Sequence, residues 1–344
     1  MRRPVLLLLL LPCLLTLTAC NPADEQGIIM AAGSYSDLAV VVAGPQTEPL
    51  ARRFLEQVNV NTTFVIKEEP LFRPDVYVGD QLKLVHRYKN VILILRIGDG
   101  GSLEKRVKSM VSKETWQHLA NGPGGMVQLN DPWATYQTVL IVATHDRNSL
   151  SSFLRSEAAS IRQIFEDSSR KRILRQFRYS GLDTRLMNAY REQFGFSFEI
   201  PKEFKQNQLK PKGFLGLELL RTGPSRGISV SWQPNEDPAA ALRDQSFLLA
   251  MREEMGERMH NEEIVPEGLR WSTTTLGELP AVKLEGAWAS TRFEGGGPFW
   301  CYFVADETRG RVFCVDLLAY APHMDKMPMF RRMATIVSTF KLVN

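Results

Sequence analysis

The 344-residue sequence lacks the short motifs by which many enzyme active sites are recognised. It has no Gly-x-Ser-x-Gly elbow for a serine nucleophile, and no Ser-x-x-Lys occurs together with its companion motifs. Its five histidines are far apart and lack a metal-ligand spacing such as His-Glu-x-x-His. We therefore expect no metal site and no cofactor. The histidines are His86, His118, His145, His260 and His323.

Phosphate-binding loops of the common kinds are absent too. Gly98–Ser102 joins an expected strand to an expected helix, but it lacks the Walker ending and the Gly-x-Gly-x-x-Gly spacing. A tight turn followed by a Ser102 cap explains the segment without a ligand; a phosphate cradle is the alternative. Carboxylate pairs such as Glu68 and Glu69 are adjacent in sequence. Their side chains diverge, so they do not predict an acid–base pair.

The chain has no strong excess of charge of either sign. It carries 42 basic and 38 acidic residues, a formal net charge of +4, and no charged tail. Nucleic acid is therefore not an expected partner. With 44% apolar residues the chain is globular rather than disordered. Its length allows two ordinary domains, each with a core of its own.

The N-terminal apolar run is too short to span a bilayer. Val5–Leu17 has about a dozen residues, against the ~20 that a spanning helix needs. Pro12 lies in its middle, where it would kink such a helix. Arg2 and Arg3 precede the run and supply the positive start of a signal peptide. Residues 1–19 are therefore predicted to be a cleaved leader.

The end of the leader predicts lipidation of Cys20. Leu-Thr-Ala directly precedes Cys20 and matches the lipobox; a plain secretory signal is the alternative. A lipobox cysteine carries diacylglycerol and usually a further acyl chain such as palmitate, enough for lasting attachment. Position +2 is Asn21 rather than the aspartate that retains lipoproteins in the inner membrane. We expect the outer membrane, with the polypeptide on the periplasmic face.

Two cysteines remain once the leader is removed and Cys20 is lipidated. Cys301 and Cys314 lie in two apolar runs joined by Asp306–Gly310, a polar turn typical of a β-hairpin. If the turn is centred on the middle of this segment, Cys301 lies directly opposite Cys314, within reach of a disulfide. Two buried, reduced thiols are the alternative, because a slip of one residue would turn the side chains apart.

Two domains are expected after a polar tether at residues 20–35. From residue 36 to 195 strands and helices alternate, and this α/β domain ends in a long helix. From 196 to 344 strands follow one another with short turns, which predicts an antiparallel sheet covered by two helices. The expected class is α+β, with two α/β-sandwich-like domains. Expected strands are 38–43, 64–66, 76–78, 90–95, 138–143, 196–200, 215–220, 228–232, 269–275, 281–288, 299–305 and 311–319, and expected helices are 49–58, 102–119, 148 onwards, 238–259 and 323–340.

Basic residues gather near the end of the long helix that begins near Asn148. Cations favour a helix C-terminus, so a solvated face with favourable dipole contacts is the first interpretation. A patch that binds phosphates or lipid headgroups is the alternative. The residues are Arg170, Lys171, Arg172, Arg175 and Arg178.

Several short segments together resemble a known family. They are Asp131–Ala134 with Gln137, Glu69–Phe72, Arg243-Asp244, Gly297–Phe299 and Tyr320–Pro322. This combination resembles two-domain bacterial lipoproteins, mostly of the Bacteroidetes type, described only as a domain of unknown function. The resemblance covers nearly the whole mature chain, and its second half is also similar in element order to PsbP and Mog1. Because the family has no established reaction, the resemblance implies no catalytic residue.

Aromatic residues near Gly- and Pro-rich loops are the remaining candidates for a binding surface. Ordinary core packing is the alternative, since aromatics dominate cores. The candidate binding residues are Trp133, Gln137, Phe299 and Trp300.

The sequence thus favours a non-catalytic outer-membrane lipoprotein that binds or scaffolds an envelope component. Its expected partners are the membrane, through Cys20, and an envelope protein or a lipid or glycan ligand. Two alternatives stay open. An envelope hydrolase would have a cleft with a perturbed titratable group near the Asp99 or His145 loops. A lipid or glycolipid carrier would have an apolar cavity in one sheet-and-helix layer.

Overall fold

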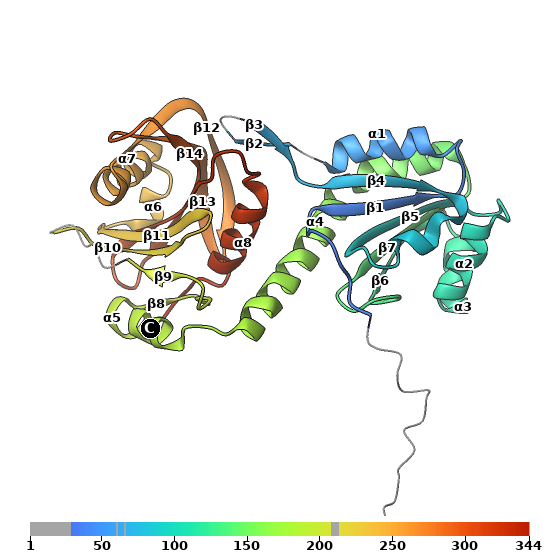
Figure 1. The fold of residues 1–344 in the computed structure, drawn as a ribbon, viewed down its shortest axis with the longest axis horizontal. Coiled ribbons are helices and arrows are strands. Elements are labelled where there is room, and N and C mark those ends of the chain that lie inside the picture. Colours follow the sequence, from blue (N-terminus) through green and yellow to red (C-terminus); the bar gives the residue numbers. More distant parts are fainter. Residues whose placement is uncertain (1–28, 60, 65–66, 208–212, 344) are drawn as a thin grey trace, which may run out of the picture.

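The computed structural model describes residues 29–59, 61–64, 67–207 and 213–343. The predicted leader, Cys20 and the tether as far as residue 28 lie outside the described residues, as does part of the strand predicted at 64–66. Two sheets form the cores of two regions (Figure 1). The long helix α4 (Arg147–Ser180) runs from the N-terminal region to the C-terminal one.

The N-terminal sheet has five strands. Two of them, β5 (Asn90–Arg96) and β7 (Thr138–Thr144), are apolar at consecutive positions and buried, because helices cover both of their faces. β1, β4, β5 and β7 run parallel, and β6 pairs antiparallel with β7 at the edge. The order across the sheet is β4 (Arg73–Val78), β1 (Asp37–Val42), β5 (Asn90–Arg96), β7 (Thr138–Thr144) and β6 (Gly125–Asn130).

Helices cover this sheet on two sides. Alternate residues of β1 divide between two cores: Val40 packs with α1 (Glu48–Val58) and α4, whereas Val41 packs on the other face. That other face is covered by η1 (Gly79–Val85), α2 (Ser102–Met110) and α3 (Lys113–Asn121).

The prediction of a single helix over residues 102–119 is wrong, because the segment forms two helices. Val111 and Ser112 are extended, and the Ser112 hydroxyl accepts a hydrogen bond from the Thr115 N–H at 3.1 Å, so a second helix starts there. Ser102 is the first residue of α2 rather than its cap, which is Gly101.

A hairpin extends from the N-terminal region. β2 (Asn61–Phe64) and β3 (Lys67–Pro70) pair antiparallel with each other and not with the main sheet. Figure 1 shows them reaching toward β12 (Glu262–Leu276) and α8 (Met327–Val337) of the C-terminal region.

The C-terminal region is built on a seven-stranded antiparallel sheet. The order is β12, β13 (Leu279–Ser290), β14 (Gly296–Asp306), β15 (Arg311–Tyr320), β11 (Ser225–Pro234), β10 (Gly216–Arg221) and β9 (Lys205–Gln206). A two-stranded ladder joins β8 (Phe196–Ser197) to β16 (Lys341–Leu342).

Two helices cover this sheet, one on each face, as predicted. α7 (Gln245–Met255) packs on the face that carries Phe299 and Phe303, and α8 packs on the face that carries Trp300 and Val304. The α+β class is confirmed. The helix expected at 238–259 is divided into three parts: α6 (Pro238–Ala241), α7 and a π-helical turn, η2 (Gly256–His260).

A further helix, α5 (Thr184–Phe194), precedes the sheet in the chain. Its Tyr190 packs against Phe196 and Phe198.

The cysteine hairpin forms, but its predicted register is wrong. Cys301 lies opposite Asp316 and Cys314 lies opposite Phe303, because the turn is centred one residue further along the chain. The two cysteines therefore lie diagonally on the same face. Their buried Sγ atoms are 3.1 Å apart as free thiols. The bridge itself stays a prediction, which alkylation in denaturant without reductant tests: two labelled thiols would contradict it.

Candidate functional site

The two regions are joined first at the start of α8. The side chain of Glu69, in the β2–β3 hairpin, accepts hydrogen bonds from the Lys326 and Met327 N–H groups, each at 2.7 Å. Glu69 is only 3% exposed. Since α8 has no side-chain cap from its own segment, the other region satisfies its first free amides.

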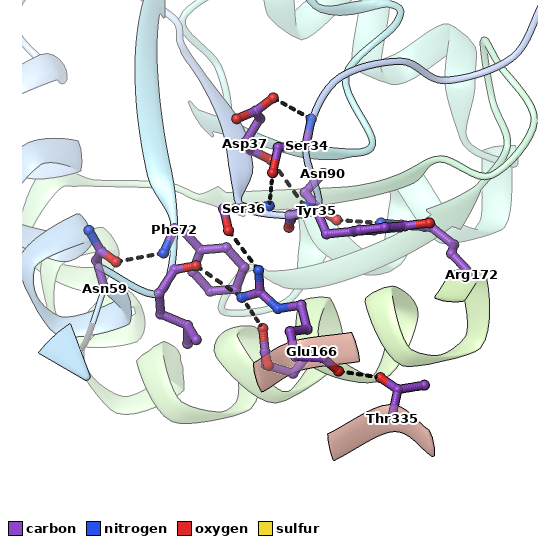
Figure 2. A network of polar contacts seen from close by, with 12 residues as sticks. Ser34, Tyr35, Ser36, Asp37, Asn59, Phe72, Asn90, Glu166, Arg172 and Thr335 are labelled. Carbon is purple, nitrogen blue, oxygen red and sulfur yellow. Dashed lines mark hydrogen bonds and ion pairs between the residues drawn. The ribbon is translucent and has the colours of Figure 1, made fainter. Parts of the chain in front are cut away.

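A second junction is centred on Arg331 of α8. Its guanidinium donates to Ser36 Oγ at 2.7 Å, to the Leu71 carbonyl at 2.9 Å and to Glu166 Oε1 at 2.8 Å (Figure 2). Arg331 is 5% exposed. These contacts join α8 to the start of β1, to the β3–β4 segment and to α4. Both terminal nitrogens of the guanidinium are hydrogen-bonded, whereas the buried Nε has no partner. A buried charged network of this kind favours one arrangement of the two regions.

Next to this junction lies a groove of about 440 Å³, which we call the interdomain groove. Its aromatic residues are Trp300 and Tyr302 of β14, each 8% exposed. Lys283 Nζ lies 3.8 Å from the centroid of the Trp300 ring. The other lining residues are Gln163, Glu166, Asp167, Arg170, Thr274, Thr275, Leu276, Met327, Arg331, Ala334, Thr335 and Ser338.

The charges of the interdomain groove are paired within it. Glu166 binds Arg331 at 2.8 Å, and Asp167 binds Arg170 at 2.7 Å. The groove therefore offers aromatic rings with neutral hydroxyl and amide groups around them. Such a lining is suited to a polar ligand without net charge, held by stacking and hydrogen bonds.

The structure does not bring the four candidate binding residues together. Phe299 and Trp300 are neighbours in β14 and point to opposite faces, so Phe299 is fully buried beneath the Arg252 guanidinium, 4.4 Å away. Trp133 stacks on His86 with ring centroids 4.5 Å apart, on the α2–α3 side of the N-terminal sheet.

Gln137 lies in a different place again. It is 2% exposed, and its Nε2 donates to the carbonyls of His86 and Tyr88 at 3.0 and 2.7 Å. It lines a separate cavity beside α4. Of the four candidates, only Trp300 belongs to the interdomain groove.

Sequence reasoning missed the residues that build the groove. Arg331 gave one local signal, because an arginine pair interrupts the otherwise apolar helix Met327–Val337. Nothing local connects Glu69 with Lys326, which are 257 positions apart.

The loops where an enzyme site was expected are engaged in structural contacts. The Gly98 and Gly100 N–H groups donate to the Glu104 carboxylate at 2.9 and 2.5 Å, so the amides of a phosphate cradle are already bound. Asp99 pairs with Arg96 at 2.7 Å, and His145 Nε2 lies 3.0 Å from the Gly122 carbonyl.

Two cavities lie near these loops. One of about 280 Å³ is lined by Ser102, Arg106 and His86, and burial lowers the pKa of His86. The other measures about 100 Å³ and is lined by Arg96 and Arg147. Asp146 caps α4, and its hydrogen bonds with Ser149 hold the pKa of that carboxyl below its usual range. Neither Asp99 nor His145 lines these two cavities, and the perturbed titratable group beside the Gly98–Ser102 turn is His86.

A cluster of perturbed groups lies instead inside the C-terminal region. The Arg252 guanidinium is 3.1 Å from Asp316 and 3.3 Å from Glu262. Burial raises the pKa of Glu262 to about 7 and lowers that of His260 to about 3. Arg252 and Asp316 are fully buried, so this is an internal ion cluster rather than a site open to substrate.

Two further tests concern the described part of the chain. Within it, no three histidine, cysteine or carboxylate side chains are grouped so as to hold a metal ion. None of its helices is both long and apolar enough to cross a membrane.

Comparison with known proteins finds similarity over part of the chain. None of the curated proteins matches it. Among solved structures it is similar to cyanobacterial PsbP from Synechocystis sp. PCC 6803, at 12% identity over 43% of this chain and 86% of that chain, with a TM-score of 0.32. LpqN of Mycobacterium tuberculosis, described as involved in cell envelope biogenesis, gives 16% identity, 43% and 83% coverage and a TM-score of 0.31. The Saccharomyces cerevisiae Ran-binding protein Mog1p gives 10% identity, 44% and 91% coverage and a TM-score of 0.29.

The family match is confined to the C-terminal region. It begins at Asp183, the cap of α5, and ends at Thr339, just after α8. The match is shorter than the nearly whole mature chain over which the resemblance was expected. The expected match to a family known only as a domain of unknown function is confirmed over this stretch: residues 183–339 match the family model described as a domain of unknown function (DUF4837).

Proposed function

We propose that the protein is a non-catalytic lipoprotein that binds an envelope component in the interdomain groove. It would be anchored through Cys20 in the outer membrane and face the periplasm. The observation that carries the proposal is the groove itself, whose wall contains the largely buried rings of Trp300 and Tyr302 beside paired charges. Its volume of about 440 Å³ lies in the range of ligand sites, which often form where domains meet.

The chemistry of the groove favours binding over catalysis. Glu166 and Asp167 are both ion-paired with arginines, which accounts for their place in the groove without a role in proton transfer. Glu262 and His260, whose pKa values burial shifts strongly, belong to the internal cluster. Within the groove, burial raises the pKa of Tyr302, so its hydroxyl stays protonated and can serve as a hydrogen-bonding group. The mixture of hydroxyls, an amide and ion pairs around the rings is also unlike the apolar cavity that a lipid carrier needs.

Site-specific cross-linking in living cells tests the groove. A photo-reactive residue at Thr275, which is exposed at the groove, is expected to capture one envelope component repeatedly. The same residue at the exposed Lys105 of α2 is the control and should capture none. Ala334→Arg, which fills the groove, should abolish the product. Equal capture from both positions, or capture unchanged by Ala334→Arg, would contradict the proposal.

The anchor is tested separately. Cells fed labelled palmitate are expected to incorporate the label into the protein and to hold it in the outer-membrane fraction. Cys20→Ser should lose both properties. A Cys20→Ser protein that remains labelled would exclude Cys20 as the lipidation site.

A further inference from the structure

A second cavity, independent of the interdomain groove, lies between α4 and the turn that joins β6 to β7. Its volume is about 590 Å³, and we call it the α4 cavity. Its walls are the basic end of α4 and the first residues of β7. The lining residues are Gln128, Asn130, Asp131, Tyr136, Gln137, Thr138, Ser168, Lys171, Arg172, Leu174, Arg175 and Arg178.

The α4 cavity has an excess of positive charge. Four cations line it, against one carboxylate, Asp131. Glu199 neutralises Arg178 at 2.6 Å. Within the described part of the chain, Lys171, Arg172 and Arg175 have no carboxylate within ion-pair distance. Three cations therefore face this cavity without a neutralising partner.

Arg172 is the most unusual of the three. It is 9% exposed, and it donates only to neutral oxygens: Asn90 Oδ1 at 2.7 Å, Thr138 Oγ1 at 2.8 Å and the Lys89 carbonyl at 3.0 Å. Burial lowers its pKa to about 10, so it stays charged at neutral pH. A buried cation is normally matched by an anion, because desolvating it alone is costly.

The partners of Arg172 are fixed in their turn. The Asn90 side-chain nitrogen donates to the carbonyls of Tyr35 and Asp37, each at 3.1 Å, which directs the oxygen of the amide toward the guanidinium. Figure 2 shows Arg172 meeting Asn90 at the start of β5. The charge is therefore held in place before any ligand binds.

Arg175 is held at the rim by an aromatic ring. Its guanidinium carbon lies 5.0 Å from the centroid of Tyr136. Tyr136 and Asp131 have φ values of 68° and 56°, in the left-handed region that non-glycine residues rarely adopt. Such backbone strain in a turn is often retained where a ligand is bound.

The cavity also lies where the chain from the predicted anchor reaches the sheet. The Ala31 N–H donates to the Thr135 carbonyl at 3.0 Å, and the Thr135 N–H donates to the Ile29 carbonyl at 2.9 Å. Tyr136 and Gln137 follow directly. Ile29 follows Cys20 by nine positions, a chain length that reaches at most about 30 Å. A lipid-anchored protein would hold this cavity near the membrane surface.

We infer that the α4 cavity binds a phosphate-bearing anion through Lys171, Arg172 and Arg175. Phosphate oxygens accept several charged hydrogen bonds at once, and arginine suits them particularly well. The phosphate would come from a lipid headgroup or from a soluble phosphoester. The inference does not depend on the interdomain groove, so either site can fail without the other.

Calorimetry with glycerol 3-phosphate as the probe tests the site in the full chain. Lys171 and Arg175 are exposed, so Lys171→Gln with Arg175→Gln should leave the fold intact. The double change is expected to weaken binding at least about tenfold, because two charged hydrogen-bond donors are removed. Arg155→Gln, an exposed change on the same helix outside the cavity, is the matched control and should have no effect.

A membrane arm distinguishes the two sources. The lipidated protein is placed in phosphatidylcholine vesicles with or without phosphatidylglycerol, and hydrogen exchange of residues 131–138 is compared. Protection that appears only with phosphatidylglycerol, and only with the cations intact, identifies a headgroup. Binding of glycerol 3-phosphate without such protection identifies a soluble phosphoester. No binding in either arm, or binding that the double variant retains, would overturn the inference.

Discussion

Two buried arginines, one in each region, are held in opposite ways. Arg252 in the C-terminal region lies between Asp316 and Glu262, so its charge is matched inside the protein. Arg172 in the N-terminal region contacts neutral oxygens only, among them Asn90 Oδ1. The first arrangement is complete in itself. The second leaves a positive charge beside a cavity, which distinguishes a candidate ligand site from an internal ion cluster.

The sharpest test of this contrast is Arg252→Met. The change leaves Asp316 and Glu262 buried without their cation, so we expect a loss of ~3–5 kcal/mol in the free energy of unfolding. Urea denaturation measures it. Arg258→Met, which removes a partly exposed ion pair to Glu254, is the control and should cost less than ~1 kcal/mol. Similar losses in the free energy of unfolding for Arg252→Met and Arg258→Met would show that the buried ion cluster contributes no more than an exposed ion pair.

Glu262 should contribute to the pH dependence of the free energy of unfolding. Burial raises its pKa to about 7 from an ordinary value of 4.5, so the unfolded chain releases this proton first. Its contribution is therefore complete below pH 4.5 and is lost as the pH rises to about 7. In Glu262→Gln the decline over this interval should be smaller by ~2–3 kcal/mol.

Denaturation at several pH values measures that difference. His260 has a pKa lowered to about 3 by burial and contributes the opposite slope, stability lost as the pH falls below 6.5. His260 is present in both the unaltered protein and Glu262→Gln, so its contribution cancels when the two stability curves are subtracted. Parallel stability curves for the two proteins would show that Glu262 ionises normally.

Arg172→Met should be milder than Arg252→Met. The change leaves three neutral oxygen acceptors without their donor but leaves no carboxylate unpaired, so we expect a loss of ~1–2 kcal/mol in the free energy of unfolding. Glycerol 3-phosphate should raise the unfolding temperature of the unaltered protein and leave that of Arg172→Met unchanged. Thermal unfolding with and without the ligand measures both effects. A loss as large as that of Arg252→Met would mean that Arg172 is essential to the fold.

The smallest effect concerns the contact between the regions. Glu69→Ala leaves the first amides of α8 without their acceptor, so we expect a loss of ~1 kcal/mol, seen as faster hydrogen exchange in α8 than in α7. Glu56→Ala, on the exposed side of α1, is the control. Exchange in α8 that is unaffected by Glu69→Ala would show that the C-terminal region caps this helix in another way.

The sequence was informative where a pattern is local. The consecutive apolar residues of Asn90–Leu95 predicted a central strand, and the successive strands with short turns from residue 196 onwards predicted an antiparallel sheet covered by two helices. The break at Ser112 was missed because a capping serine within a helical pattern resembles any other exposed serine. The register of the cysteine hairpin depended on the exact centre of one turn.

The candidate sites were harder to predict because their residues come from distant segments. Adjacent aromatics in β14 look equivalent in sequence, yet strand geometry places Phe299 in the core on one face and Trp300 in the wall of the groove on the other. The basic residues of α4 were noticed as a group. Only the folded chain shows that Glu199 neutralises Arg178 and that Arg172 has no such partner.

The cap that Glu69 provides for α8 has a consequence for how the protein can be divided. Residues 183–339 are the stretch that the family match recognises, yet α8 within it takes its cap and the partners of Arg331 from residues 36, 69, 71 and 166. If the stretch were cut out alone, a buried arginine and two amides would face water. The stretch that the family match covers therefore leaves out contacts that α8 makes in the described chain, and a fragment cut at its ends would have to hold this helix without them.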